Sequence, residues 1–219
     1  MNFKKISIAL VTMLMIACAD DTTETFDHAA QYTTEKVAIE SYLSSHYLNL
    51  DDNNDTPADA TDDVYTILAI PEGGSQTPLN DANSPFALES ATAVLNEVTY
   101  TYYYIITNAG DATQDVEADD TINVNYILRN TSGSVIEEND NNDSRFTITS
   151  GIMGWQEGIP NFNGGVPDES DATKARTYTN TGKGFLIIPS GLGYQNLGSG
   201  AVSGNTTLIF YINLKGVAE

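Results

Sequence analysis

Apolar and polar positions alternate through much of the second half of the chain, which is typical of β-strands with one buried face. In residues 122–128, for example, apolar side chains at every second position enclose Asn123 and Asn125. Residues 146–148 alternate in the same way, and residues 102–106 form a continuous aromatic and aliphatic run with strand composition. Turn residues lie between these segments. A single short helical pattern starts at Gln156, within the glycine-punctuated stretch of residues 151–159. Short strands with one short helix predict an α+β fold, in which an antiparallel β-sheet wraps around the helix.

The first half of the chain shows a different period. Apolar residues recur every three or four positions over residues 33–48, which predicts an amphipathic helix with Thr33 or Thr34 as its N-cap. Residues 64–70 have strand composition and end at a Pro-Glu-Gly-Gly turn. The segment 64–96 could therefore add a strand or a hairpin to the main domain, and the sequence leaves its position open.

The first 17 residues form a predicted signal peptide. Two lysines precede the apolar run Ile6–Ile16, which is too short for a good membrane span. The run ends in Met-Ile-Ala followed by Cys18, which resembles a bacterial lipobox, in which the cysteine becomes the lipid-bearing first residue. An ordinary signal peptide with an incidental cysteine is the alternative. Lipidation would anchor the protein to the membrane, and the outer membrane is the expected location.

These patterns divide the chain into three parts. A signal peptide spans residues 1–17, and the main domain spans residues 97–219. Between them, residues 18–96 contain a lipid tether, the amphipathic helix, an acidic linker and the strand whose position is open.

Charge and residue content exclude several function classes. The net charge is −21 with only nine Lys and Arg residues, so a nucleic-acid partner is not expected. No Ser-His-Asp set, phosphate-binding loop or zinc spacing is present, so neither a cofactor nor a metal is expected. The run Asp51–Asp55 resembles a calcium loop only superficially, because Thr56 stands where an EF-hand needs glycine. The oligomeric state is left open.

Three ordered blocks carry the strongest functional signal. The first, Gly151–Ile159, holds the only tryptophan; Gly184–Tyr194 and Thr207–Leu214 follow. A lone tryptophan is more often a core residue than a site residue. The order of all three blocks, however, resembles the FKBP-type peptidyl-prolyl cis-trans isomerases over about residues 97–217.

The resemblance implies a proline-shaped aromatic pocket. Such a pocket needs no nucleophile, because an apolar site favours the twisted, less polar form of the peptide bond. Matched motif by motif, the catalytic residues are Tyr126, Phe146, Ile152, Trp155, Tyr194 and Phe210, and further substrate-binding residues are Ile136, Glu137 and Val202. The family also implies that the Tyr194 hydroxyl and the Ile152 backbone N–H donate to ligand carbonyls. The partners implied are proline-containing polypeptides.

Some positions depart from the family pattern. Ile136 stands where the family has an aromatic residue, Glu137 where it has Asp, and Gln195 where it has Gly. Extra residues lie around 168–181, and the loop before Gly151 is shorter. The expected function is a prolyl isomerase that assists the folding of exported or envelope proteins. A non-catalytic module that binds a proline-containing segment of an envelope partner is the alternative, and a structural surface lipoprotein with a degenerate pocket is a third.

Overall fold

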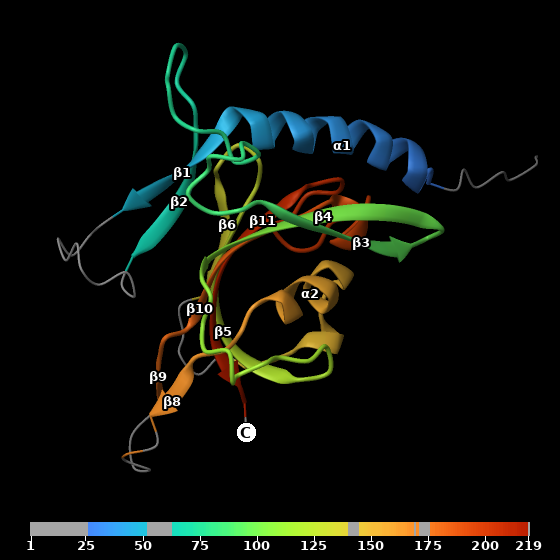
Figure 1. The fold of residues 1–219 in the computed structure, drawn as a ribbon. Helices are drawn as coiled ribbons and strands as arrows, with labels where there is room; N and C mark the ends of the chain where they lie inside the picture. The colour runs from blue at the N-terminus through green and yellow to red at the C-terminus, as the bar shows by residue number, and fades with distance from the viewer. Residues whose placement is uncertain (1–25, 52–62, 140–144, 169, 171–175, 219) are drawn as a thin grey trace, which may run out of the picture.

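A seven-stranded antiparallel sheet forms the centre of the molecule (Figure 1). The computed structural model describes residues 26–51, 63–139, 145–168, 170 and 176–218. The strand order is β3-β4-β10-β11-β5-β6, and β7 also pairs with β5. The bounds are β3 (Glu89–Leu95), β4 (Val98–Asn108), β5 (Thr121–Arg129), β6 (Val135–Asn139), β7 (Arg145–Thr147), β10 (Gly182–Ile188) and β11 (Leu208–Val217).

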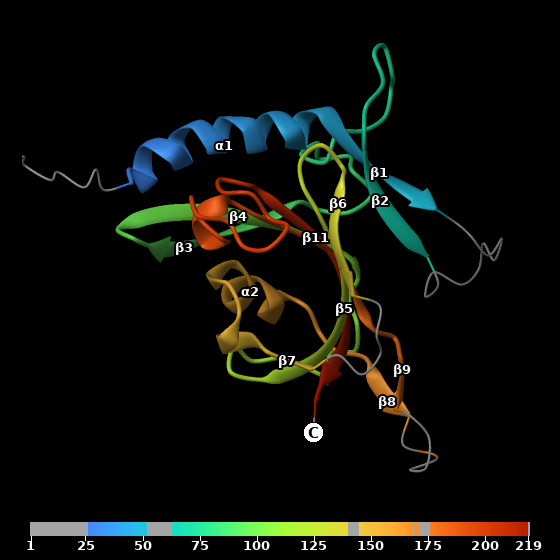
Figure 2. The same ribbon diagram turned by 180° about the vertical axis from the view of Figure 1, so that it is seen from behind.

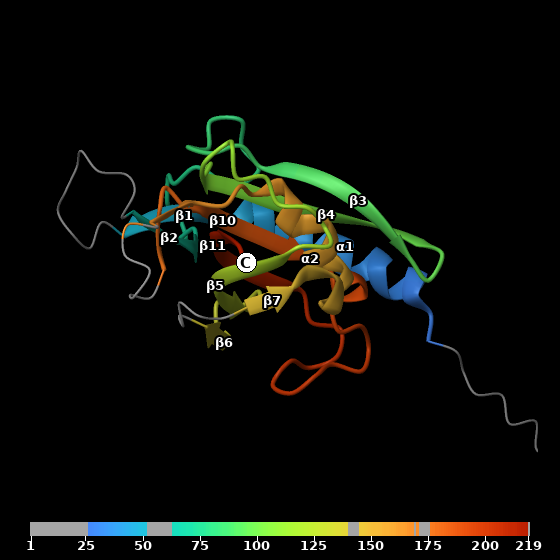
Figure 3. The same ribbon diagram turned by 90° about the horizontal axis from the view of Figure 1, so that it is seen from below.

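The sheet curves around a short helix, α2 (Met153–Gly158), which lies on its concave side (Figures 2 and 3). Gly154 and Gly158 are four residues apart and share one helix face. A Cβ atom at Gly154 would lie 2.3 Å from Ile188 Cγ2, and one at Gly158 would lie 2.5 Å from Leu186 Cδ2. These glycines therefore let α2 pack closely against β10. The predicted α+β fold, an antiparallel sheet around a short helix, is confirmed.

Every residue of β10 is buried, because both faces of this central strand are covered. On the concave face Leu186 and Ile188 pack in the core that contains Trp155. On the opposite face Phe185 and Ile187 belong to a second hydrophobic core. The continuous apolar run of β10 thus reflects two separate cores, one on each side of the sheet.

The second core is covered by the N-terminal part of the chain. This N-terminal part comprises α1 (His28–Ser45), the antiparallel pair β1 (His46–Asp51) and β2 (Val64–Ala69), and the loop that follows β2. Figures 1 and 2 show α1 across one end of the sheet. The covering residues include Ile39, Tyr42, Leu43, Leu48, Ile67 and Leu79.

The predicted helix is present, but both of its ends differ from the prediction. It starts at His28 because the Asp27 side chain caps it, accepting from the Ala30 N–H at 2.8 Å. Thr33 and Thr34 are not caps, since their hydroxyls donate to helix carbonyls one turn back. The helix ends at Ser45 because His46 already has extended backbone angles and begins β1.

The segment 64–96 is divided between two sheets. The predicted strand at 64–70 is present as β2, but it pairs with β1 in a separate two-stranded sheet. β3 joins the main sheet as a hairpin with β4, whose turn residues Asn96 and Glu97 both have positive φ, 52° and 61°. The main sheet thus includes residues that precede position 97.

Short elements complete the fold. They are the strand pair β8 (Val166–Asp168) and β9 (Thr177–Thr179), and the 3₁₀ helices η1 (Ile148–Ser150), η2 (Ile159–Asn161) and η3 (Ser190–Leu192). Within the described ranges, no helix combines the length and the apolar character needed to cross a membrane. The signal peptide, Cys18 and residues 52–55 of the acidic run lie outside the described residues.

Candidate functional site

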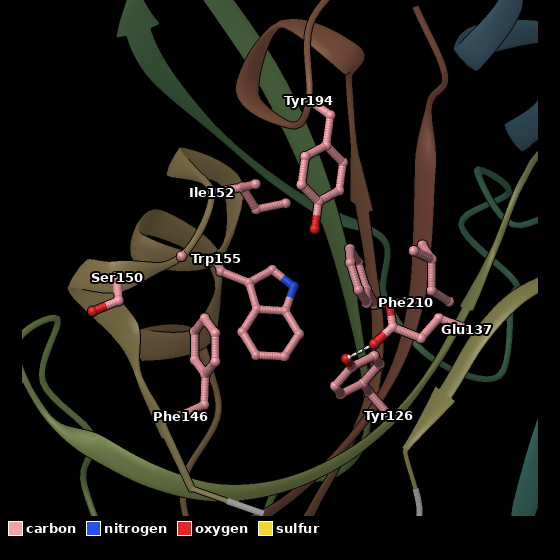
Figure 4. Close-up of a pocket in the computed structure, with 10 residues that line it drawn as sticks. Tyr126, Glu137, Phe146, Ser150, Ile152, Trp155, Tyr194 and Phe210 are labelled. Carbon is pink, nitrogen blue, oxygen red and sulfur yellow. Dashed lines mark hydrogen bonds between the residues drawn. The ribbon is translucent and has the colours of Figure 1, made fainter. Parts of the chain in front are cut away.

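A cavity of about 310 Å³ opens between α2, the concave face of β5 and β11, and the segment after η3 (Figure 4). Its walls come from β5, β6, β7, the segment from η1 into α2, the segment after η3, and β11. The lining residues are Tyr126, Leu128, Glu137, Phe146, Ser150, Gly151, Ile152, Trp155, Tyr194 and Phe210. The short helix and the curved sheet therefore bring one residue set together.

Trp155 forms the aromatic centre of this cavity. It lies in the first turn of α2 and is only 4% exposed. The rings of Tyr126, Phe146 and Phe210 surround it edge to face, with centroid distances of 5.3, 4.8 and 5.2 Å. Edge-to-face packing joins the positive edge of one ring to the negative face of the next. The four rings thus form a rigid apolar wall.

The indole N–H is the one polar group of the Trp155 side chain. Among the described residues its Nε1 is buried without a hydrogen-bond partner. Figure 4 shows it directed toward the space between Tyr194 and Phe210. The indole would report directly on any molecule that enters this space.

Tyr126 and Glu137 form the polar side of the cavity. The Tyr126 hydroxyl donates to Glu137 Oε1 at 2.5 Å. Burial, and then this hydrogen bond to the carboxylate, raise the pKa of Tyr126 well above its usual value. The phenol is held in place by an exposed carboxylate on β6.

Tyr194 enters from the opposite side, two residues after η3. Its hydroxyl points into the space above Trp155 (Figure 4). Burial raises the pKa of Tyr194, and the negative charge of Glu137 raises it further. A protonated phenol in this position can donate a hydrogen bond to a carbonyl oxygen of a ligand.

Ile152 lies at the junction between the loop and α2. As the N-cap residue its carbonyl accepts from Trp155 N at 2.9 Å and Gln156 N at 3.2 Å. The Gln156 side chain returns to the Gly151 carbonyl at 2.9 Å and fixes the preceding loop. In the described part of the chain the Ile152 N–H has no backbone acceptor. It is thus available to a ligand.

The structure brings together most of the residues that the resemblance implies. Those that line the cavity are Tyr126, Glu137, Phe146, Ile152, Trp155, Tyr194 and Phe210. Ile136 is half-buried against the core and does not line the cavity. The reason is a register shift between β5 and β6. Leu128 pairs with Glu137 and Arg129 with Val135, so Ile136 has no paired residue in β5. Val202 is buried in the loop after Tyr194, where it pairs with Ser199, and it does not line the cavity either.

Three lining residues were not predicted. Leu128 lies two positions after Tyr126 on the same strand, so the strand period could have identified it. Ser150 and Gly151 directly precede Ile152. Gly151 opens the first of the three sequence blocks, whereas Ser150 carries no signal of its own. A Cβ atom at Gly151 would lie 2.6 Å from Phe146 Cζ, so the Phe146 ring rests against this glycine.

The arrangement suits a small apolar ring with a neighbouring carbonyl. The walls are aromatic and aliphatic, and the polar groups are two phenols, one carboxylate, one serine hydroxyl, the indole N–H of Trp155 and backbone N–H groups. Binding sites of this kind use apolar walls for affinity and a few polar groups for orientation. In the described residues no cluster of three or more His, Cys, Asp or Glu side chains could hold a metal ion.

About half of the chain is similar to a known protein family. Residues 112–215 match the family model of FKBP-type peptidyl-prolyl cis-trans isomerases. No curated protein matches the chain. Among solved structures, a peptidyl-prolyl cis-trans isomerase from Pseudomonas syringae pv. tomato is 23% identical, with a TM-score of 0.44 over 54% of this chain and 76% of that chain.

Two further solved structures are similar to the same extent. FkpA from Escherichia coli is 24% identical, with a TM-score of 0.44 over 59% of this chain and 52% of that chain. AtFKBP13 is 22% identical, with a TM-score of 0.41 over 53% of this chain and 93% of that chain.

Proposed function

We propose that this protein, which through residues 112–215 belongs to the FKBP-type peptidyl-prolyl cis-trans isomerase family, catalyses the rotation of X-Pro bonds in exported or envelope proteins. The observation that supports catalysis most directly is the cavity itself. It joins a four-ring apolar wall around Trp155 to a phenol donor, Tyr194, on its opposite side.

The proposed mechanism depends on desolvation and positioning. Amide resonance gives the peptide bond a rotation barrier of roughly 18–20 kcal/mol and makes its planar form polar. The walls formed by Tyr126, Phe146, Trp155 and Phe210 exclude water, which disfavours the planar form relative to the twisted one. The Tyr194 hydroxyl and the Ile152 N–H hold the neighbouring carbonyl groups. No residue has to form a covalent intermediate.

A proline-limited refolding or peptide isomerisation assay tests this proposal. Uncatalysed X-Pro exchange takes tens of seconds at 25 °C, so even weak catalysis is measurable. We expect micromolar protein to shorten this relaxation. If the protein binds proline peptides and the relaxation time stays the same, catalysis is excluded and a binding module remains.

The binding module is the second candidate, and one observation favours it. Ile136, which stands where the family has an aromatic residue, does not reach the cavity, and the exposed Glu137 occupies that side. The side toward β6 therefore has no ring from that position and is more open to water. A proline-containing segment could still bind there without its bond being desolvated enough to rotate.

Trp155 provides a direct test of where the ligand binds. Because its indole lies at the base of the cavity, we expect its emission to shift when a proline-containing peptide binds. The signal is clean, since the chain has only one tryptophan. Saturating binding seen by calorimetry with unchanged emission would place the ligand elsewhere.

The location in the cell envelope is also a proposal, and Cys18 tests it. The lipobox-like sequence supports a lipid on the Cys18 thiol, and each buried CH₂ of its chains contributes about 0.8 kcal/mol to membrane binding. We therefore expect Cys18→Ser to lose acyl incorporation and to move from the membrane fraction to the soluble fraction. Cys18→Ser that stays in the membrane fraction to the same extent would show that the anchor lies elsewhere.

A further inference from the structure

One buried carboxylate joins α1 to the loop that carries Tyr194. Glu35 is only 6% exposed. The Ser190 N–H donates to its Oε1 at 2.7 Å, and the Ser190 hydroxyl donates to its Oε2 at 2.6 Å. The Thr207 hydroxyl donates to Oε1 at 2.6 Å. Three donors, 155 and 172 residues further along the chain, thus converge on a single helix side chain.

The residues around the Glu35 carboxylate and its three donors leave the Ser190 segment little freedom to move. Hydrogen bonds to a charged group are strong, and leaving their buried donors unpaired costs free energy. Tyr32, one helix turn before Glu35, packs on Tyr100 at a centroid distance of 4.7 Å, and its hydroxyl accepts from the Thr101 N–H at 2.7 Å. A Cβ atom at Gly191 would lie 2.2 Å from the Tyr100 ring. The turn that follows Ser190 therefore packs in close contact with the Tyr100 ring, which in turn packs on Tyr32.

From Ser190 a short path of hydrogen bonds leads to the cavity. The Ser190 carbonyl accepts from the N–H groups of Gly193 and Gln195, both at 2.9 Å. These two residues flank Tyr194. The Gln195 carbonyl then accepts from the Asn205 N–H at 2.7 Å, which closes the loop two residues before Thr207. Both ends of the loop that contains Tyr194 are thus tied, directly or by short steps, to Glu35.

We propose that Glu35 is a positioning residue of the isomerase site, and that α1 is a working part of that site. Glu35 does not reach the cavity. It acts through Ser190, which sets the backbone on both sides of Tyr194 and so directs the Tyr194 hydroxyl toward the ligand. This inference rests on the proposed function, because it assigns Glu35 a role in the same site.

The first test does not depend on activity. Amide hydrogen exchange of Gly193 and Gln195 is measured in the full-length protein, relative to the amides of β11. We expect the two amides to exchange at least about tenfold faster in Glu35→Ala. In this variant, local opening of the loop no longer has to break the hydrogen bonds between Ser190 and the Glu35 carboxylate. Glu35→Gln, which keeps one acceptor oxygen, is expected to lie between Glu35→Ala and the wild type.

Two variants of the same helix serve as controls. Glu40→Gln changes an exposed carboxylate of α1 that faces Lys36 at 3.9 Å. Ile39→Ala removes a side chain that is 2% exposed in the second core, so it destabilises α1 without touching Ser190. Neither control is expected to change the relative exchange of Gly193 and Gln195. If Ile39→Ala raises the relative exchange of these two amides as much as Glu35→Ala does, the contact of Glu35 with Ser190 and Thr207 only stabilises the fold. The proposal is then overturned.

The second test connects the contact of Glu35 with Ser190 and Thr207 to catalysis. At a temperature at which every variant is folded, Glu35→Ala is expected to lower kcat/KM by about fivefold, as much as the loss of the one neutral hydrogen bond that the Tyr194 hydroxyl makes to the ligand. Glu40→Gln and Ile39→Ala should stay within about twofold of the wild type. In a Tyr194→Ala background, Glu35→Ala should cause almost no further loss, since its effect passes through Tyr194.

The outcomes separate the two proposals. Additive effects of Glu35→Ala and Tyr194→Ala overturn the positioning role, and so does an unchanged kcat/KM in Glu35→Ala. If the wild type binds proline peptides but has no isomerase activity, the proposed function fails. The positioning role is then decided by peptide affinity, read from Trp155 emission, in the same set of variants. Equal affinities in Glu35→Ala and the wild type would overturn it.

Discussion

Tyr126→Ala is expected to remove most of the isomerase activity, with kcat/KM lower by about 100-fold, or about 2.7 kcal/mol of transition-state stabilisation. Its ring packs on both Trp155 and Phe210, at centroid distances of 5.3 and 5.8 Å. Removing it opens the apolar wall and admits water to the rotating bond. The measurement is peptide isomerisation, at a temperature at which circular dichroism shows that the variant is folded.

Matched variants separate the ring from its hydroxyl. Tyr126→Phe keeps the ring and loses only the hydrogen bond to Glu137, so a loss of less than about tenfold is expected. Tyr194→Phe should likewise retain much of the activity, because a neutral hydrogen bond contributes on the order of 1 kcal/mol. Phe210→Ala should resemble Tyr126→Ala, provided that it folds. Near wild-type activity in folded Tyr126→Ala would contradict catalysis by desolvation.

The second large effect concerns the N-terminal part of the chain. A chain of residues 97–219 alone is expected not to fold into a stable monomer. It would lack β3, and it would expose Phe185, Ile187 and Ile209 on the outer face of the sheet. Full burial of each large apolar side chain contributes about 1.5–3 kcal/mol, so losing the cover from α1, β1 and β2 would remove much of a typical stability of about 5–15 kcal/mol.

Thermal unfolding compares this chain with one that starts at residue 26. The longer chain should unfold cooperatively, whereas the shorter one should bind a hydrophobic dye and aggregate. A cooperative transition of residues 97–219 at the same midpoint would show that the second core contributes little to stability.

Local pattern determined those features that depend on neighbouring residues. Strand period placed Tyr126 on the buried face of β5, and glycine spacing placed Trp155 at the start of a short helix. A helix was also predicted, at residues 33–48, but neither of its observed ends, His28 and Ser45, was predicted. A capping residue acts through one hydrogen bond, and Asp27 and the two threonines are all suitable residue types in the sequence.

The order of the three sequence blocks carried the resemblance to the isomerase family and predicted most of the residues that line the cavity. The structure brings Tyr126, Phe146, Tyr194 and Phe210 into one cavity around Trp155, as the resemblance implies. The position of Ile136 was not predictable, because it depends on a register shift between β5 and β6. Register is set by cross-strand packing, which a single strand's pattern does not contain.

By itself, the sequence of this protein determined the α+β fold, the short central helix and an ordered set of aromatic residues. Tertiary structure alone decided how the N-terminal part of the chain is used. The helix period showed that α1 must bury a face, but it could not show that Glu35 would meet Ser190 and Thr207. An acidic residue in a helix usually faces water, and it is buried only where distant donors replace its hydration. Those donors come together only when the whole chain has folded.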